Sequence, residues 1–141
     1  MEAVVEKEAG YKSLQVWKLG IDLVKQVYEV TRQFPKEELY GIVSQIRRAA
    51  ISVPSNIAEG NSRRNKKEFQ QYLFIALGSL SELETQFVIS SELGYIADDS
   101  FYMMLSNTIN KLRAMLLNLV RSLKVQRSTW HVVRGTREES V

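Results

Sequence analysis

The sequence predicts an all-α fold, namely an antiparallel up-down-up-down bundle of four helices. Apolar residues recur every three or four positions in four segments, no segment alternates like a half-buried strand, and the connections between the segments are short. With 141 residues and 45% hydrophobic side chains, the chain can bury one core. We expect a flexible N-terminus over residues 1–10, the bundle over 11–125 and a flexible C-terminal tail over 126–141.

The first helix is expected to begin at Ser13, whose side chain can cap a helix N-terminus, and to end at the stretch QFPKEE. It carries two apolar stripes. The first comprises Leu14, Trp17, Ile21, Val24, Tyr28 and Thr31, and the second comprises Val16, Leu19, Leu23, Val27, Val30 and Phe34. Because one bundle core needs only one such stripe, this helix is expected to bury two faces.

The second helix is expected to start directly after Pro35, with Glu37 and Glu38 in its first turn. Gly60 is expected to end it in a left-handed cap. The inward residues are Leu39, Ile42, Ile46, Ala50, Val53 and Ile57. Pro54 falls inside this pattern and should kink the helix, because proline lacks an N–H group and its ring crowds the preceding turn, at a cost of about 3 kcal/mol.

The third helix is expected to follow Asn65, which forms a capping-box-like pair with Glu68 three residues later. Its buried residues are Phe69, Leu73, Ala76, Leu80, Leu83 and Phe87. The stretch ELGYIADDS then leads to a fourth helix, capped by Asp98, Asp99 or Ser100. This last helix repeats Phe101, Leu105, Thr108, Leu112, Met115 and Leu119.

A second stripe of small and polar side chains runs beside the apolar stripe of the second helix, comprising Gln45, Ala49, Ser52, Asn56 and Glu59. Two interpretations stay open: the solvent face of a bent helix, or a partly buried polar network or channel lining in an oligomer. Because glycine inside a helix lets another backbone come close, we predict that the kinked segment packs near Gly78 and Ser79. Glu82 or Glu84 is then expected to reach its polar groups.

Four of the five residues at the expected start of the third helix are basic, namely Arg63, Arg64, Lys66 and Lys67. A helix N-terminus already carries about half a positive charge, so these side chains make it attractive to anions such as a phosphodiester backbone. The other interpretation is a solvated charge run at a turn. Further cations contribute only if the fold brings them together: Arg47, Arg48, Lys111, Arg113, Arg121, Lys124, Arg127, Arg134 and Arg137.

The formal net charge of +3 is unevenly distributed along the chain. Residues 41–75 carry six basic and two acidic side chains, whereas residues 76–100 carry five acidic and no basic ones. Such blocks predict faces of opposite potential. Because aromatic residues are poorly interleaved with the cations, contact with a nucleic-acid backbone is expected rather than base stacking.

Residue types that common catalytic and metal sites require are missing. The chain has no cysteine, and its single histidine, His131, lies in the expected tail, which excludes thiol chemistry and a Glu-x-x-His di-iron site. Glu82 and Glu84 point about 200° apart on a helix and cannot act as one acid–base pair. We therefore expect no enzyme, no metal and no cofactor.

The N-terminus, MEAVVEKEAG, lacks the basic and apolar regions of a signal peptide. No apolar run approaches the roughly 20 residues that span a bilayer. A cytoplasmic protein without a membrane partner is the resulting expectation.

The chain resembles the bacterial four-helix-bundle proteins encoded in intervening sequences of large-subunit ribosomal RNA genes, in four stretches: LQVWKLGIDLVKQVYEVTRQFP, SQIRRAAISVPSNIAEG, EFQQYLFIALGSLSELETQF and LGYI. The resemblance covers about residues 11–120 and implies a homopentamer. It also implies a structural or assembly role, and no catalytic one, for the residues matching the family motifs: Ser52, Pro54, Asn56, Glu59, Gly60, Gly78, Ser79 and Glu82. The chain is also similar to the accessory variability protein of diversity-generating retroelements, a basic pentameric barrel that binds nucleic acid and a reverse transcriptase.

These observations predict a non-enzymatic oligomer that binds the backbone of RNA or DNA. The candidate binding residues are Arg47, Arg48, Arg63, Arg64, Lys66 and Lys67. The expected partners are further copies of the chain, RNA or DNA and, by resemblance, a protein such as a reverse transcriptase. The alternative is an assembly scaffold for a protein partner without direct nucleic-acid binding, in which the basic groups serve solubility or meet an acidic surface.

Overall fold

A computed structural model describes residues 10–11 and 14–123 of the chain. Over these residues the chain forms four α-helices and one short 3₁₀ helix, with no strand: α2 (Gln15–Thr31), η2 (Lys36–Glu38), α3 (Ile42–Asn61), α4 (Lys66–Glu92) and α5 (Asp99–Ser122). The predicted all-α class is confirmed. The expected cap at Ser13, residues 1–9 of the expected N-terminal segment and the tail over 126–141 lie outside the described residues.

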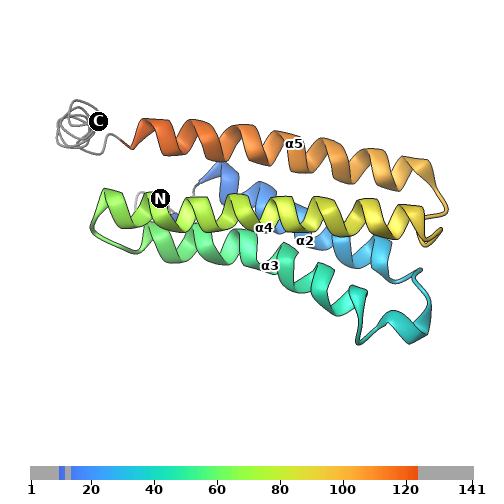
Figure 1. Cartoon of the computed structure of the whole chain (residues 1–141). Helices are drawn as coiled ribbons and strands as arrows, with labels where there is room; N and C mark the ends of the chain where they lie inside the picture. The colour runs from blue at the N-terminus through green and yellow to red at the C-terminus, as the bar shows by residue number, and fades with distance from the viewer. Residues whose placement is uncertain (1–9, 12–13, 124–141) are drawn as a thin grey trace, which may run out of the picture.

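The four helices form a bundle around one apolar core. Helix α2 packs against α3 and α5, and α4 packs against the same two helices. In Figure 1 the α2–α3 and α4–α5 connections lie at one end of the molecule, and the α3–α4 connection lies at the other. The most deeply buried large side chains come from all four helices and include Leu23, Ile46, Ile57, Leu73, Leu80, Leu83, Leu105, Ile109, Leu112 and Leu116.

The two apolar stripes of α2 differ in how deeply they are buried. Most of the second stripe is fully buried, at Val16, Leu23, Val27, Val30 and Phe34. Most of the first is half-buried, at Leu14, Trp17, Ile21, Val24 and Tyr28. Within the chain, α2 therefore buries one face completely and only partly covers the other.

The second long helix begins later than predicted. Residues Lys36–Glu38 form η2, and α3 starts at Ile42 after Gly41, whose backbone angles lie outside the helical region. The prediction that Glu37 and Glu38 open this helix is therefore wrong. Tyr95 fixes the intervening segment, since its hydroxyl donates a hydrogen bond of 2.7 Å to Glu38 Oε2. Leu39, expected inside the core, is 45% exposed as a result.

Gly60 does not end α3 in a left-handed conformation, so this prediction is also wrong. Helix α3 continues to Asn61, and among the described residues the only positive φ belongs to Gly94, two residues after the end of α4. Gly60 is buried instead where α3 meets α4. A Cβ atom at this position would lie 2.7 Å from Cβ of Tyr72 and 2.9 Å from Cδ1 of Phe69. The missing side chain is thus required by helix packing rather than by backbone conformation.

Pro54 lies inside α3, as its sequence position predicts, and is buried. A Cβ atom on Gly20 of α2 would lie 3.2 Å from Cβ of Pro54, so the proline sits where α2 and α3 approach closely. Figure 1 shows α3 bent along its course, with its N-terminal part diverging from α4. A proline inside the helix accounts for this bend.

By length and composition α4 could cross a membrane, which the apolar runs of the sequence did not predict. The core helix of a soluble protein passes the same test, so the finding carries little weight. Helix α4 packs one side against α3 and α5, and its other side bears exposed apolar residues. One side of α4 is therefore left uncovered within the chain.

Candidate nucleic-acid interface

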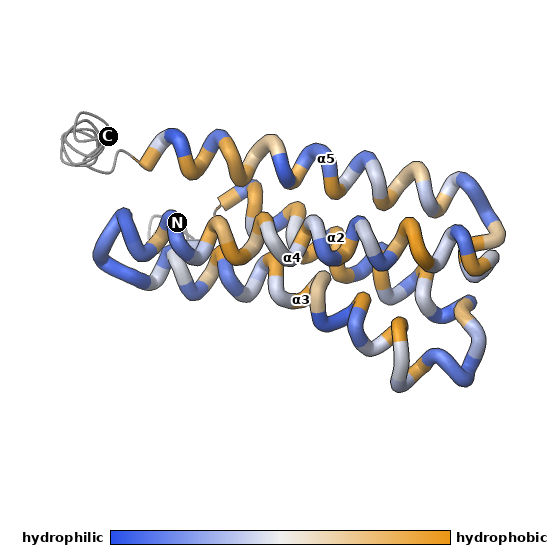
Figure 2. Tube along the Cα trace, in the orientation of Figure 1, coloured by the Kyte–Doolittle hydropathy of each residue, from blue (hydrophilic) through white to orange (hydrophobic). Residues whose placement is uncertain are grey.

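The predicted start of the basic helix is confirmed. Asn65 caps α4, because its side-chain Oδ1 accepts hydrogen bonds from the backbone amides of Lys67, at 2.8 Å, and Glu68, at 3.3 Å. The cap occupies two of the amides that a helix start leaves free. Attraction of an anion to this end therefore depends on the basic side chains and the helix macrodipole more than on open amides. Figure 2 shows the α3–α4 connection as a continuous hydrophilic stretch.

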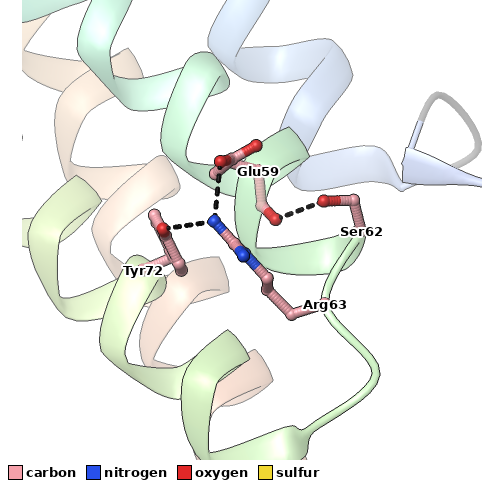
Figure 3. Close-up of polar contacts among 4 residues, drawn as sticks. All are labelled: Glu59, Ser62, Arg63 and Tyr72. Atoms are coloured by element: carbon pink, nitrogen blue, oxygen red, sulfur yellow. Dashed lines mark hydrogen bonds and ion pairs between the residues drawn. The ribbon is translucent and has the colours of Figure 1, made fainter.

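Arg63 is held in place by two neighbours (Figure 3). Its Nη2 atom donates hydrogen bonds of 2.9 Å to Oε1 of Glu59 and 2.9 Å to the hydroxyl of Tyr72. Its guanidinium carbon also lies 5.2 Å from the centroid of the Tyr72 ring. The Tyr72 hydrogen bond, followed by the charges of Tyr72 and Glu59, raises the pKa of Arg63 above its ordinary value. Arg63 is thus always charged, but part of its charge is compensated inside the protein.

Arg64, Lys66 and Lys67 differ from Arg63 in having no such partner. All three are exposed, and the only ion pairs among the described residues are Arg63–Glu59 and Arg113–Glu84. We call the four residues Arg63, Arg64, Lys66 and Lys67 the basic turn. Three of its cations are free to contact a ligand, and they stand at the positive end of a helix macrodipole.

Gln70 links the basic turn to the end of α5. Its Nε2 atom donates hydrogen bonds of 2.8 Å to the carbonyl oxygen of Val120 and 2.9 Å to that of Leu123. The exposed cation Arg121 belongs to this last turn of α5. The fold thereby brings a fifth basic residue to the same end of the bundle. The other C-terminal cations, Lys124, Arg127, Arg134 and Arg137, lie outside the described residues, as does His131.

Arg47 and Arg48 are not brought to the basic turn. They lie near the start of α3, and the 15 residues from Arg48 to Arg63 correspond to about 22 Å of helix at about 1.5 Å per residue. On α5, Arg113 pairs with Glu84 at 2.8 Å, so it does not join the site either. The six predicted binding residues thus form two separate groups, at opposite ends of one helix.

The charge blocks of the sequence are only partly separated in the fold, since Arg47 and Arg48 of the basic block lie away from the basic turn and Glu82 and Glu84 of the acidic block lie inside α4. The basic turn and Arg121 lie at the α3–α4 end, whereas Glu37, Glu38, Glu92, Asp98 and Asp99 surround the α2–α3 and α4–α5 connections. The α3–α4 end is therefore predominantly basic, whereas toward the other end the acidic groups are mixed with the cations Arg32, Lys36, Arg47 and Arg48. A polyanion meets an attractive field at the α3–α4 end.

The predicted contact between α3 and Ser79 is confirmed. The hydroxyl oxygens of Ser52 and Ser79 lie 2.7 Å apart, and Asn56 Nδ2 donates to the Ser52 hydroxyl at 2.9 Å and to its carbonyl oxygen at 2.8 Å. These atoms are partly buried, which favours the polar-network interpretation over a plain solvent face. Glu59, at the end of the same stripe, is exposed and pairs with Arg63 instead.

The other parts of that prediction are wrong within the chain. Gly78 is exposed, and a Cβ atom there would meet nothing within 4 Å, so no backbone approaches it. Glu84 is engaged by Arg113 rather than by the polar groups of α3. Glu82 is exposed on the outer side of α4 and does not reach the Ser52 network.

Within the described part of the chain, no group of three or more His, Cys, Asp or Glu side chains could hold a metal ion. The residues singled out at the basic turn are hydrogen-bond donors, and only Arg63 among them is paired with a carboxylate. Their chemistry suits binding of an anion.

A comparison with protein-family models matches residues 12–118 to the 23S rRNA-intervening sequence protein model. The chain belongs to this family. The matched range contains all four helices up to the last turns of α5, together with the basic turn and the Ser52 network. No curated protein matches the chain closely enough to count as a relative.

Sequence reasoning missed three contributors to these sites. Gln70 and Tyr72 lie on α4 among ordinary helical residues. The partners of Gln70 are at the end of α5, and the partner of Tyr72 is in the α3–α4 connection. Tyr40 has an exposed side chain, at 93%, and lies near Arg47 and Arg48 in space although seven residues separate it from the first. Tyr40 could have been placed beside Arg47 and Arg48 only by extending the helical projection of α3 into the segment that precedes this helix.

Proposed function

We propose that this family member is a non-enzymatic homopentamer of antiparallel four-helix bundles, and that it binds the backbone of RNA or DNA through the basic turn. The observation that carries the proposal is the exposure of Arg64, Lys66 and Lys67, without acidic partners, at the N-terminus of α4. The family description connects the chain with ribosomal RNA genes but gives no ligand.

The contacts at the basic turn favour the backbone of a nucleic acid over its bases. Lysine and arginine on exposed positions neutralise phosphates and release their counterions, which gives affinity without sequence readout. Asn65 orders the backbone of the turn through the cap, and Arg63 orders it through its hydrogen bonds to Glu59 and Tyr72. The exposed side chains of Arg64, Lys66 and Lys67 make no ion pair and can contact phosphates from this ordered backbone.

Assembly is supported by the outer face of α4, which we define as the exposed apolar residues Phe74, Ile75, Val88, Ile89 and Leu93. Each is between 43% and 55% exposed. They form two apolar clusters, one of Phe74 and Ile75 and one of Val88, Ile89 and Leu93, with the exposed residues Gly78, Ser81, Glu82 and Thr85 between them. Exposed apolar clusters are typical of interfaces between proteins. Five copies are what the family resemblance implies. Because Phe74 and Ile75 follow the basic turn on the same helix, contact through this face gathers several basic turns and multiplies modest affinities.

The binding proposal is tested by fluorescence anisotropy with a mixed-sequence structured RNA across a salt series. The variant carries Arg64→Gln, Lys66→Gln and Lys67→Gln. A matched control removes the same charge from exposed lysines elsewhere, with Lys25→Gln, Lys36→Gln and Lys111→Gln. Because each phosphate contact contributes about 0.9 to the slope of log affinity against log salt, the turn variant should lose affinity and flatten the slope, and the control should do neither to the same extent.

Absence of RNA binding by the native chain at low salt would contradict this proposal and favour the alternative of a scaffold for a protein partner. Equal reductions of affinity in the turn variant and the control would show that only net charge matters.

Oligomerisation is tested by native mass spectrometry of the full chain. Ile75→Glu and Ile89→Glu on the outer face of α4 should reduce the mass from about five subunits toward one, because each places a charge in an apolar contact. Met103→Glu on α5, where the native side chain is 60% exposed, is the matched control and should leave the mass unchanged. A native chain that is monomeric at micromolar concentration would exclude the homopentamer.

A further inference from the structure

A second surface, at the other end of α3 from the basic turn, carries a groove that the proposed function does not use. It is an open hollow of about 480 Å³ between the end of α2, the segment after η2 and the first turns of α3. Its lining includes Tyr28, Leu39, Tyr40, Arg47, Arg48 and Ile51. Because the hollow is open to solvent, it can hold one face of a planar ring against its lining without enclosing the ring.

The walls of the groove are apolar and uncovered. Tyr40 is 93% exposed, Leu39 is 45% exposed and Ile51 is 43% exposed. A tyrosine ring that packs on nothing in its own chain offers a complete face to a ligand. Aromatic faces of this kind are what single-stranded nucleic-acid binding proteins use to stack bases.

The floor of the groove holds a fixed cation. Arg47 Nε donates a hydrogen bond of 3.0 Å to the Thr31 hydroxyl, which itself donates one of 2.7 Å to the carbonyl oxygen of Val27. The guanidinium carbon of Arg47 lies 4.3 Å from the centroid of the Tyr28 ring. The guanidinium is therefore held by Thr31 through Nε and by the Tyr28 ring on one face. Its two terminal amino groups are left to donate hydrogen bonds to a ligand. A guanidinium plane is also a surface on which bases stack.

The charge of the groove is not compensated. Neither Arg47 nor Arg48 takes part in the two ion pairs found among the described residues, and Arg48 is exposed. An occupant that combines a flat apolar ring with a negative group satisfies both features at once. The ring contacts Tyr40, Leu39 and Ile51, and the negative group meets the two arginines.

The groove also lies within reach of a strand held at the basic turn. The exposed residues Arg48, Ile51, Ser55 and Glu59 follow one side of α3 and lead from the groove to Arg63. This path is about 22 Å long at about 1.5 Å per residue, and a stacked strand that advances about 3.4 Å per nucleotide covers it with about seven nucleotides. A ligand that engages the turn through its phosphates can thus place a base in the groove.

We propose that this groove is a stacking site for an unpaired base of single-stranded nucleic acid, with the adjoining phosphate on Arg47 and Arg48. This inference rests on the proposed function, because it concerns the same class of ligand. It goes beyond the proposed function, because the basic turn recognises phosphates alone whereas this groove requires a base. It differs from the expectation from sequence, which was contact with a nucleic-acid backbone rather than base stacking.

The test measures binding of two fluorescent strands of the same length to the full chain, one of mixed sequence and one made of abasic nucleotides with the same phosphates. The native chain should bind the base-containing strand about 5- to 150-fold more tightly, the range expected for one stacked base. Tyr40→Ala should make the affinities for the two strands nearly equal, and Tyr40→Phe should retain the difference between them. Because Tyr40 is 93% exposed, both variants should fold like the native chain, which circular dichroism checks.

Equal affinity of the native chain for both strands would overturn the stacking site while leaving the proposed backbone binding intact. Conversely, the ratio of the two affinities could depend on Tyr40 while the basic-turn substitutions leave the affinity for RNA unchanged. That outcome would support the stacking site and show that the basic turn does not bind the nucleic acid. If Tyr40→Ala changes the mass of the assembly and not the ratio, a second copy of the chain covers the groove, and the inference is wrong.

Discussion

Gly60 on α3 faces Tyr72 on α4 so closely that a Cβ atom at residue 60 would lie 2.7 Å from Cβ of Tyr72. The same Tyr72 accepts a hydrogen bond from Arg63 of the basic turn, at 2.9 Å. The close approach of the two helices therefore also sets the position of the turn. A change at Gly60 should affect both stability and the geometry of the candidate interface.

The first prediction concerns the two glycines of the family motifs. Gly60→Ala should lower the free energy of unfolding by about 1–3 kcal/mol, because the added methyl group overpacks the contact with Tyr72 and Phe69. Gly78→Ala is the matched change at an exposed helical glycine with open space around it, and it should raise stability by up to about 1 kcal/mol. Urea unfolding followed by circular dichroism measures both. Destabilisation by Gly78→Ala would instead indicate a contact with another copy of the chain.

A second prediction addresses the hydrogen bond between Ser52 and Ser79. Ser52→Ala and Ser79→Ala should each cost about 0.5–1.5 kcal/mol, and the double variant should cost less than the sum because both remove the same contact. Ser55→Ala, at an exposed position on the same helix, serves as the control and should change stability little. Strict additivity of the two serine substitutions would mean that the pair does not interact.

The third prediction concerns the link between α4 and α5. Replacing Gln70 by leucine removes both hydrogen bonds to the carbonyl oxygens of Val120 and Leu123, and the last turn of α5 should fray. Amide hydrogen exchange in that turn should accelerate while exchange in the middle of α5 stays slow. Gln71→Leu is the neighbouring control, since Gln71 is exposed. Unchanged exchange in the Gln70 variant would show that other contacts hold the end of α5.

The fourth prediction concerns the dependence of stability on pH at the start of α5. Asp98 Oδ1 accepts a hydrogen bond of 2.8 Å from the Ser100 amide, and hydrogen bonding from Ser100 lowers the pKa of Asp98 below 3.8. Because the folded pKa lies below the unfolded one, the stabilisation is present above pH 3.8 and disappears as pH falls through the folded pKa. The difference in unfolding free energy between the native chain and Asp98→Ala, measured from neutral pH into the acid range, should therefore shrink as the pH falls below 3.8. A difference that is constant over this range would mean that the carboxylate does not act as the cap.

Local signals were sufficient for much of the fold. The periodicity of apolar residues predicted the helices. Asn65 was recognised as a cap, and the cap of α5 was narrowed to Asp98, Asp99 or Ser100, because a helix start depends on side chains within three residues. The start of α3 was mispredicted because the segment after Pro35 is fixed by Tyr95, which follows 57 residues after its partner Glu38. No local pattern contains that contact.

The same distinction explains the candidate sites. The basic turn could be found from sequence because its cations are neighbours in the chain. The difference between Arg63 and Arg64 could not, because it depends on Tyr72 of the next helix. Likewise, the fixed orientation of Arg47 depends on Thr31 of α2, 16 residues earlier. Gly60 shows the limit most plainly, since a glycine needed for packing and one needed for a left-handed cap look identical in sequence.

The last prediction separates these two neighbouring arginines. Arg63→Gln removes the ion pair with Glu59 and the hydrogen bond to Tyr72, so it should lower the melting temperature, while its effect on the salt dependence of RNA binding should be small. Arg64→Gln should leave the melting temperature unchanged, because this exposed side chain has no partner within the described residues, and should reduce the salt slope by about 0.9 for each phosphate that Arg64 neutralises. Thermal unfolding and anisotropy on the same preparations measure both quantities. If instead both variants weaken binding equally and neither changes the melting temperature, Glu59 and Tyr72 do not restrain Arg63, and all four cations of the basic turn are equally available to phosphate.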